Sequence, residues 1–326
     1  MTVEQDTGRE LAWRAFRPED AGAAADLMAA AEAVDKTGEN YDADDIIEEL
    51  VNDLIDLEAD TRVVWDGEQM VAMGHVFGWA TVNEVHGVLC QGCVRPTHRR
   101  RGIGAQLLRW QLQRGEQLHA ATHPRVPANV KVGVAENNSG LEALVRAEGL
   151  EPIRSWFEMG RDLHGDFPGL QPVPGIRLAP FDPDLDDEVR RAHNIAFRDH
   201  FGSTERTPEE WRQYFTGTRA FRADLSLLAL ADGSGTGEGH ADVAGYLLGY
   251  IYDADVAAKG RRDVLLGQLG TLPAYRGRGI GSALLARALA DWAAAGHEYA
   301  CLGVDTANGT GALGLYERAG LRVVKT

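Results

Sequence analysis

Cysteine is scarce in this sequence of 326 residues, which contains only Cys90, Cys93 and Cys301. Three thiols are too few, and odd in number, for a disulfide framework, so we expect a reducing compartment. Cys90 and Cys93 form a C-x-x-C pair, but residues 88–94 predict a strand, in which side chains three positions apart face opposite sides of the sheet. This pattern disfavours a metal or redox site at the pair, and we expect no metal.

Basic residues and long apolar runs are also in short supply. The 33 Lys and Arg residues face 49 Asp and Glu residues, for a formal net charge of -16. Such a charge repels phosphate backbones and anionic lipid surfaces, so we expect neither nucleic acid nor membrane as a partner. No apolar run approaches the length of a membrane span, and residues 1–10 are acidic and polar where a secretory signal is basic and apolar. We therefore expect a cytoplasmic protein.

One segment of the sequence occurs twice. Residues 94–104, VRPTHRRRGIG, recur at residues 271–281 as TLPAYRGRGIG. A second match joins residues 137–150 to residues 308–321. A repeat of this kind indicates two copies of one domain, which agrees with the length, since a domain takes roughly 150 residues.

The two copies are predicted to meet in a segment rich in proline and glycine. Residues 163–175, LHGDFPGLQPVPG, show no helical or strand periodicity, as is typical of a linker. We therefore predict an N-terminal domain over residues 1–165, a linker over 166–175 and a C-terminal domain over 176–326.

In both copies an apolar strand leads through a proline into an Arg/Gly loop and then a helix. Backbone N–H groups of residues 276–281 and the positive end of the following helix would converge on a pyrophosphate, and the glycines let it approach the main chain. The spacing fits neither a Walker loop, which needs Gly-Lys-Ser/Thr, nor a G-x-G-x-x-G dinucleotide fingerprint. The helix has one apolar face, formed by Leu284, Leu285, Ala288, Leu289 and Trp292.

This loop resembles the Arg/Gln-x-x-Gly-x-Gly/Ala signature of the GNAT superfamily of N-acetyltransferases, which matches residues 276–281 and 99–104. A second signature of the superfamily matches Asn308 followed by residues 315–321, LYERAGL. The resemblance covers nearly the whole chain, since the tandem layout is similar to that of mycothiol synthase and its relatives. It implies an α/β (α+β) fold of two tandem domains, each a mixed, mostly antiparallel sheet flanked by helices.

The same resemblance implies an enzyme that uses acetyl-CoA as co-substrate and transfers the acetyl group directly to a primary amine of a small molecule or peptide. Tyr316 is the implied acid, because a phenol with a pKa near 10 can donate a proton to the departing thiolate, and packing of a helix face is the alternative. Backbone amides near residues 270–272 would polarise the thioester carbonyl. Implied coenzyme contacts are Leu269, Gly270, Thr271, Arg276, Gly277, Arg278, Gly279, Ile280, Gly281 and Asn308, and in the first copy Cys93, Val94, Arg99, Gly102, Gly104 and Asn137. Asn308 is equally suited to cap a helix.

The first copy lacks the tyrosine that is the implied proton donor of the second copy. Val145 aligns with Tyr316, so we expect the N-terminal domain to be degenerate, with weak or no catalysis. Arg100 replaces Gly277, which disfavours a positive φ but adds a charge that attracts phosphate. Acetyl-CoA binding by this domain and a purely structural role are both compatible with the sequence.

The general base is left open by the residues. Relatives often place a Glu on the fourth strand, where this sequence has Gln268, an amide that cannot accept a proton. Other candidates are Asp253, Asp263, Tyr250, Tyr252 and His200, or an ordered water that relays the proton.

Two further points stay open at this stage. The first copy continues as a strand over residues 156–163, whereas the second stops at residue 326, so its sheet either lacks a strand or takes one from the first copy. The function has two alternatives: acetylation of an amino-sugar conjugate, as in mycothiol synthase, or a sensor that binds acyl-CoA without turnover. We expect a monomer or a homodimer, and a small-molecule amine as acceptor.

Overall fold

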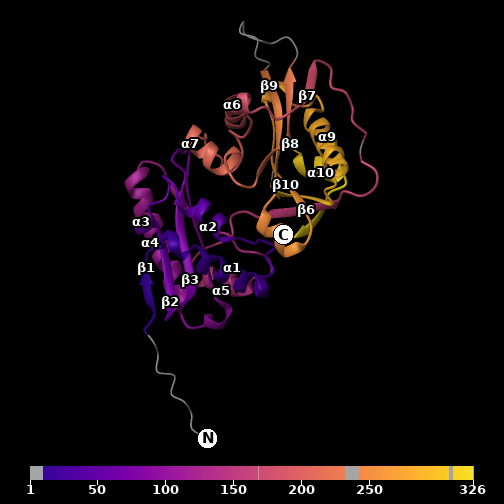
Figure 1. The fold of residues 1–326 in the computed structure, drawn as a ribbon. Coiled ribbons are helices and arrows are strands. Elements are labelled where there is room, and N and C mark those ends of the chain that lie inside the picture. The colour runs from indigo at the N-terminus through magenta and orange to yellow at the C-terminus, as the bar shows by residue number, and fades with distance from the viewer. Residues whose placement is uncertain (1–9, 168, 232–241, 308–310, 326) are drawn as a thin grey trace. The chain divides into compact units, whose positions relative to one another are not determined.

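The computed structural model describes residues 10–167, 169–231, 242–307 and 311–325. The chain divides into two compact units, residues 1–151 and residues 152–326 (Figure 1). Each unit is described by itself below, as unit 1 and unit 2.

Unit 1 is built on a five-stranded sheet with the order β1-β2-β3-β4-β5. Its neighbouring strands are antiparallel except β4 and β5, which are parallel. The strands are β1 (Ala12–Arg14), β2 (Thr61–Asp66), β3 (Gln69–Gly78), β4 (His86–Val94) and β5 (Ala128–Val132). The helices are α1 (Ala21–Asp35), α2 (Ala43–Leu50), α3 (Leu57–Asp60), α4 (Ile103–Thr122) and α5 (Ser139–Ala147), with short 3-10 turns η1 (Pro18–Asp20) and η2 (Pro96–His98).

Unit 2 is built on a seven-stranded sheet with the order β12-β6-β11-β10-β9-β8-β7. Here β10 and β11 form the parallel pair. The strands are β6 (Trp156–Asp162), β7 (Ile176–Pro180), β8 (Phe221–Ala231), β9 (Asp242–Tyr250), β10 (Asp263–Thr271), β11 (Tyr299–Asp305) and β12 (Arg322–Lys325). The helices are α6 (Asp186–Ala196), α7 (Pro208–Trp211), α8 (Asp253–Lys259), α9 (Ile280–Ala294) and α10 (Ala312–Arg318), with short turns η3 (Pro183–Leu185), η4 (Arg212–Thr216) and η5 (Pro273–Tyr275).

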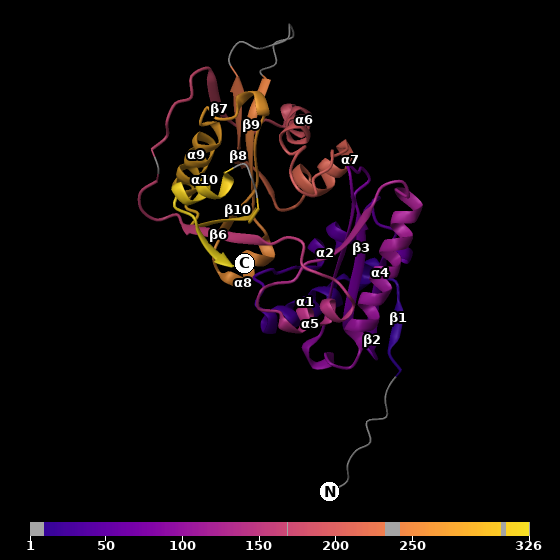
Figure 2. The same ribbon diagram turned by 180° about the vertical axis from the view of Figure 1, so that it is seen from behind.

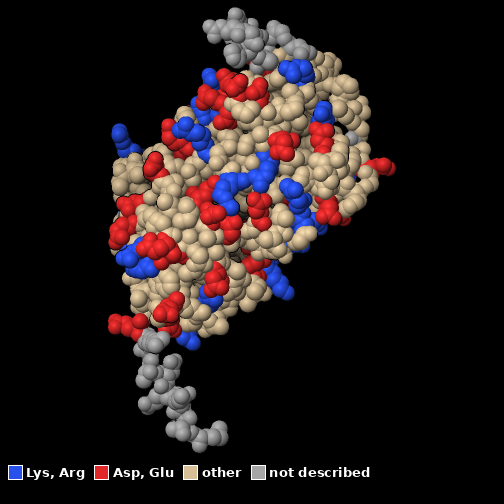
Figure 3. All heavy atoms as spheres, in the orientation of Figure 1, with Lys and Arg blue, Asp and Glu red and all other residues tan. Residues whose placement is uncertain are grey.

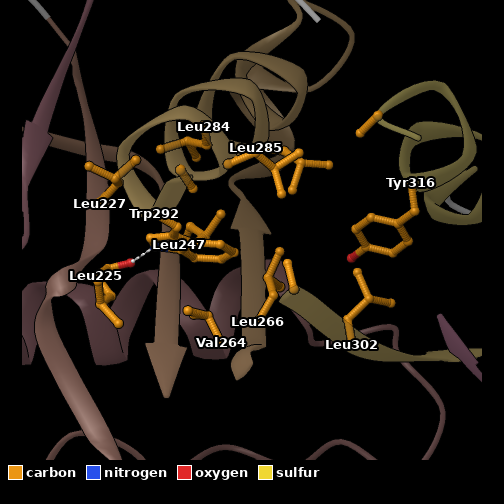
Figure 4. Packing of buried hydrophobic residues seen from close by; sticks show 14 of the residues in the cluster. Leu225, Leu227, Leu247, Val264, Leu266, Leu284, Leu285, Trp292, Leu302 and Tyr316 are labelled. Atoms are coloured by element: carbon orange, nitrogen blue, oxygen red, sulfur yellow. Dashed lines mark hydrogen bonds between the residues drawn. The ribbon is translucent and has the colours of Figure 1, made fainter. Parts of the chain in front are cut away.

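The predicted fold class is confirmed, because both units are mixed, mostly antiparallel sheets flanked by helices. In unit 2, α6 and α7 lie on one side of the sheet, and α9 and α10 lie on the other (Figures 1 and 2). The predicted apolar face of α9 is buried, with Leu284, Leu289 and Trp292 at most 1% exposed. Figure 4 shows Trp292 within this core, where its Nε1–H donates to the carbonyl oxygen of Leu225 at 2.9 Å.

Strand β6 lies between β11 and β12, so the strand that follows the first copy completes the sheet of the second. The sequence left this alternative open, and the structure selects it. The boundary between the units is therefore at Glu151 and Pro152, earlier than the predicted boundary near residue 165. The physical reason is backbone hydrogen bonding. Without β6, the N–H and C=O groups along the outer edge of β11 would have no strand to pair with.

Interactions at both ends fix β6 in this position. Before the strand, Arg154 forms an ion pair with Asp305 at 2.8 Å, and the carbonyl oxygen of Ser155 accepts a hydrogen bond from the Thr306 N–H at 3.1 Å. The Asp305 side chain is only 1% exposed. Burial alone would raise the pKa of this carboxyl, but hydrogen bonds from Arg154 and from the Ala307 N–H outweigh it and the pKa is lowered. At the far end, the Arg161 guanidinium donates to the carbonyl oxygen of Ala319.

The surface of the protein carries charged side chains of both signs. Acidic side chains are spread over the face shown in Figure 3, interspersed with basic ones. None of the helices that the structure describes is long and apolar enough to cross a membrane.

The position of β6 predicts that a core mutation in this strand destabilises unit 2. Met159 is fully buried in the core that contains Leu302 and Leu321, so Met159→Ala should lower the free energy of unfolding of unit 2 by about 2–5 kcal/mol. Hydrogen exchange should accelerate in β11 and α9 and stay unchanged in β3 and β4. Trp156→Ala is the matched control, because this β6 side chain is 49% exposed. Faster exchange confined to unit 1 would contradict the assignment of the strand.

Candidate active site

The main feature of unit 2 is a gap between β10 and β11. These strands pair only from Asp263 to Leu265, opposite Tyr299 to Cys301. Beyond that point β10 stays paired with β9 as far as Thr271, and β11 stays paired with β6 as far as Asp305. Over residues 266–271, which include Leu269, Gly270 and Thr271, the β10 edge that faces β11 therefore has backbone groups with no strand partner in the described part of the chain.

A β-bulge lies at the start of this free edge. The register of β10 against β9 shifts between Leu266 and Gln268, which leaves Gly267 as the extra residue. Bulges bend a strand and increase its twist, and this one lies where the pairing of β10 with β11 has ended.

The predicted phosphate loop follows β10 directly. Gly277 and Gly279 have φ values of 74° and 87°, a conformation that favours glycine at both positions. A Cβ atom at either position would meet nothing within 4 Å, so the space in front of the loop is open. Helix α9 begins at Ile280 and has no side-chain cap, so the N–H groups of its first turn, including Gly281, are available to an anion.

The side chains of the two arginines of this loop donate hydrogen bonds to backbone carbonyl oxygens, and the Arg278 guanidinium also lies over the Tyr275 ring. Arg276 donates to the Ala196 oxygen at 2.7 Å and to the Thr271 oxygen at 3.3 Å, and Arg278 donates to the Pro174 oxygen at 2.8 Å. Neither forms an ion pair with a carboxylate among the residues that the structure describes. The loop therefore keeps its positive charge, which suits a pyrophosphate.

Tyr316 lies on α10 and packs against the same face of the sheet as α9. Figure 4 shows its ring beside Leu302 with the hydroxyl directed toward the sheet. The residue is 8% exposed, and its hydroxyl makes no hydrogen bond to a described residue. Burial raises the pKa of Tyr316 to about 12, so the phenol stays protonated.

Asn308, the other predicted residue of this region, lies outside the described residues. The structure therefore leaves its two predicted roles as they stand.

Unit 1 repeats the gap and the loop. Strand β4 pairs with β5 only as far as Cys90, whereas its pairing with β3 continues to Val94. Arg100 has a φ of 64° and Gly102 a φ of 83°, so the loop has the same backbone shape as in unit 2 although Arg100 is not glycine. The expectation that arginine would avoid a positive φ here is wrong, and the conformation costs roughly 1–2 kcal/mol.

The polar groups of the unit 1 loop are bound by the end of α1. Arg99 forms a bidentate ion pair with Asp35, with both distances 2.6 Å. The Asn137 side-chain amide donates to the backbone oxygen of the same aspartate at 2.5 Å. Cys93 is on β4 beside this ion pair, where burial raises the pKa of its thiol to about 12. Gly104 lies in the first turn of α4, and the alignment places buried Val145 at the position of Tyr316.

Most of the proposed bases are engaged elsewhere or are too buried to serve. Asp263 forms an ion pair with Arg261 at 2.5 Å, at the paired end of β10, and Asp253 lies 3.4 Å from Arg222. Burial raises the pKa of Tyr250 far above its usual value. Gln268 lies on β10 opposite Leu248 of β9. The base therefore stays open, with His200, Tyr252 and an ordered water still candidates.

The structure also shows a buried polar pair that the sequence did not indicate. The Nδ1 atom of His193 on α6 lies 2.7 Å from the hydroxyl of Tyr246 on β9. The two residues are far apart in the sequence and match no motif, so spacing alone could not have joined them.

A surface hollow of about 630 Å³ lies apart from the gap, at the end of α10, and is lined in part by Arg161, Arg318 and Arg322. Arg161 and Arg322 donate to the carbonyl oxygens of Ala319 and Glu317, near the end of this helix. Such contacts are typical of helix C-capping, and we assign these two arginines that structural role.

Comparisons with known proteins agree with this architecture. The family model described as "Acetyltransferase (GNAT) family" matches residues 24–131 and 187–321. A mycothiol acetyltransferase from Mycobacterium sp. (strain JLS) is 30% identical over 278 residues, which cover 83% of this chain and 80% of that protein. A second, from Mycolicibacterium vanbaalenii, is 30% identical over 249 residues, covering 72% and 70%.

Solved structures show the same tandem layout. A GCN5-related N-acetyltransferase from Sphaerobacter thermophilus superimposes with a TM-score of 0.70 at 25% identity, covering 97% of this chain and 93% of that one. A tandem GNAT protein from the clavulanic acid biosynthesis pathway gives a TM-score of 0.69 at 18% identity, covering 96% and 95%. The family model matches both units, and each unit has one gap and one Arg/Gly loop. This chain therefore belongs to the GNAT family of acetyltransferases.

Proposed function

We propose that unit 2 transfers an acetyl group directly from acetyl-CoA to a primary amine of a small molecule or peptide. The observation that carries this proposal is the gap between β10 and β11, which has a positively charged phosphate loop at its end. In the adjoining core lies the Tyr316 hydroxyl, which makes no hydrogen bond to a described residue. The free edge of β10 at residues 269–271 suits the amide groups of a pantetheine arm, and the loop suits its pyrophosphate.

The residues of unit 2 can be assigned to the steps of this reaction. Acetyl-CoA supplies the activated acyl group as a thioester. Attack by the amine nitrogen forms the C–N bond and moves the carbonyl electron pair onto oxygen, where backbone N–H groups of β10 stabilise the charge. The C–S bond then breaks, and the Tyr316 hydroxyl donates its proton to the sulfur. The nitrogen gives up its extra proton to the general base or to water, and solvent returns a proton to Tyr316.

For the acceptor, we propose an amino-sugar conjugate as the finer assignment. The support is the similarity to mycothiol acetyltransferases over most of both chains. The net charge of -16 suits a cationic amine. The test is CoA release with glucosamine, an aminoacyl-glucosamine and a short peptide as acceptors, where preference for the peptide would overturn the sugar assignment and leave the transfer reaction intact.

The alternative is a sensor that binds acyl-CoA without turnover. Gln268 favours it, because an amide cannot act as a base, whereas the Tyr316 hydroxyl, which bonds to none of the described residues, favours catalysis. Absence of acetyl transfer to every amine, with tight acetyl-CoA binding, would support the sensor.

Removal of the Tyr316 hydroxyl should separate chemistry from binding. Tyr316→Phe should lower kcat by roughly 10²- to 10⁴-fold with little change in the Kd of acetyl-CoA, because the ring still packs and only the proton donor is lost. Tyr299→Phe is the matched control, since this tyrosine lies on β11 at its paired end. Equal kcat values in the two variants would exclude Tyr316 as the acid.

The two loops should differ in acetyl-CoA affinity. Gly279→Glu should abolish the tightest site in a calorimetric titration, because it places a carboxylate in front of the unit 2 loop. Gly102→Glu is the matched control, with a similar positive φ and similar open space. In unit 1, Asp35 neutralises Arg99, so Asp35→Asn should strengthen binding there. Loss of the tightest site in the Gly102→Glu variant alone would contradict the assignment of unit 2.

A further inference from the structure

A row of polar side chains in unit 1 leads from helix α2 to strand β4, which borders the gap. The carboxylate of Glu49 on α2 lies 3.5 Å from Nε2 of His75 on β3. His75 is the direct partner of Gln91 in the β3–β4 ladder. Directly opposed residues of an antiparallel pair carry their side chains on the same face of the sheet, with Cβ atoms about 5 Å apart. Glu49, His75 and Gln91 therefore form one continuous polar row.

The last member of the polar row lies where the gap of unit 1 begins. Strand β4 pairs with β5 only as far as Cys90, so Gln91 is the first residue of β4 without a β5 partner. Gln91 is exposed, and the Glu49 side chain is 30% exposed. The His75 side chain between them is only 7% exposed. Both ends of the row are therefore accessible to a ligand from solvent, whereas the imidazole holds Glu49 in place.

Helix α4 fixes the backbone of both strands at this level. The side-chain amide of Gln111 donates to the backbone oxygen of Gln91 at 2.7 Å and to that of His75 at 3.1 Å. Gln111 is 5% exposed, so both hydrogen bonds are shielded from water. They keep His75 and Gln91 opposite each other at the start of the gap.

Unit 2 has no counterpart of the polar row. Gln268, which aligns with Gln91, is opposite Leu248, a fully buried leucine. Conversely, unit 1 has Val145 where unit 2 has Tyr316. The two units therefore differ in opposite ways, because unit 2 keeps the proton donor for the departing thiolate and unit 1 keeps a carboxylate beside the gap.

The unit 1 loop also keeps positive charge for the phosphates of a coenzyme. Arg99 is bound by Asp35, but Arg100 and Arg101 are exposed and form no ion pair among the residues that the structure describes. Helix α4 begins at Ile103 without a side-chain cap, so the N–H groups of its first turn are available to an anion.

Burial gives the members of the polar row protonation states that suit proton uptake. It raises the pKa of Glu49 to about 7, and the charge of Asp45 on the same helix acts in the same direction. Burial lowers the pKa of His75 to about 4, against the opposite effects of Gln91 and Asp60. Near neutral pH the imidazole is therefore neutral, and the carboxyl group is balanced between its two forms, as a general base requires.

We propose that unit 1 is a second, slower acetyl-transfer site, in which Glu49 accepts a proton from a cationic primary amine bound beside Gln91, and His75 is the residue that positions Glu49. This inference rests on the proposed reaction and goes beyond its assignment to unit 2. The site is slower because it lacks the proton donor, although a thiol with an ordinary pKa of about 8.5 can leave as a thiolate near neutral pH.

The protons of this second reaction balance without an acid from the protein. Glu49 takes one proton from the ammonium group and passes it to solvent. The neutral amine then attacks the acyl carbon, forming the C–N bond, and the C–S bond breaks as the carbonyl re-forms. The nitrogen loses its extra proton to Glu49, and the CoA thiolate takes a proton from water.

The test is acetyl transfer by the full chain carrying Gly279→Glu, which places a carboxylate in front of the unit 2 loop, with amines that wild type accepts. Its rate should exceed that of the Gly102→Glu/Gly279→Glu double variant, in which both loops carry a carboxylate. Adding Glu49→Gln to Gly279→Glu should lower this residual rate roughly 10²-fold. Adding Glu48→Gln, which alters the adjacent carboxylate of the same helix, is the matched control and should leave the rate unchanged.

The pH dependence of the same residual activity tests the role of His75. In the Gly279→Glu variant, kcat should rise with pH toward a midpoint of about 7 and level off above it, because only the ionised Glu49 carboxylate accepts a proton. Adding His75→Leu, which copies Leu248 of unit 2, should move the midpoint to higher pH, because the carboxylate loses the N–H group beside it. Glu48→Gln should leave the midpoint unchanged.

The outcomes separate this inference from the proposed function. A residual rate equal to that of the double variant, with acetyl transfer by wild type intact, would overturn the inference and leave unit 2 as the only site. Equal residual rates after Glu49→Gln and Glu48→Gln would overturn it as well. If Glu49→Gln does not fold, the midpoint in His75→Leu decides, and an unchanged midpoint would overturn the inference. Failure of wild type to acetylate any amine would overturn the proposed function itself.

Discussion

The architecture of unit 2 depends on the loss of pairing between two parallel strands. After Leu265 and Cys301, β10 pairs only with β9, and β11 pairs only with β6, among the described strands. The backbone groups of each strand are therefore hydrogen-bonded on its outer side and lack a strand partner on its inner side. The bulge at Gly267 bends β10 at this point. The result is a sheet with unpaired backbone groups in its interior, where a linear ligand with amide groups can take the place of a strand.

The sheet of unit 2 is complete only with a strand that lies next to unit 1 in the sequence. Strand β6 pairs with both β11 and β12, and Arg154 fixes its start by a buried ion pair with Asp305. A buried pair of this kind contributes less to stability than to specificity, because desolvation offsets much of the attraction. The two repeats are therefore not interchangeable halves, since one continues into the sheet of the other.

The sequence predicted the parts of the site that depend on local chemistry. Glycines 277 and 279, the uncapped start of α9 and the burial of its apolar face follow from residue types and their spacing. The position of β6 was not predictable, because strand pairing is a long-range property and the local pattern only indicates that a strand exists. The contact of His193 with Tyr246 joins a helix to a strand more than fifty residues later, and the positive φ of Arg100 follows from the fold around the loop, which overrides the preference of the residue.

The central claim is that unit 2 binds acetyl-CoA along the free edge of β10. Hydrogen exchange of backbone amides, with and without acetyl-CoA, tests it most directly, because it reads the groups that the claim assigns to the coenzyme. The account predicts slower exchange at residues 269–271 and in the first turn of α9. Slower exchange confined to residues 91–104 of unit 1, with no change in unit 2, would contradict it.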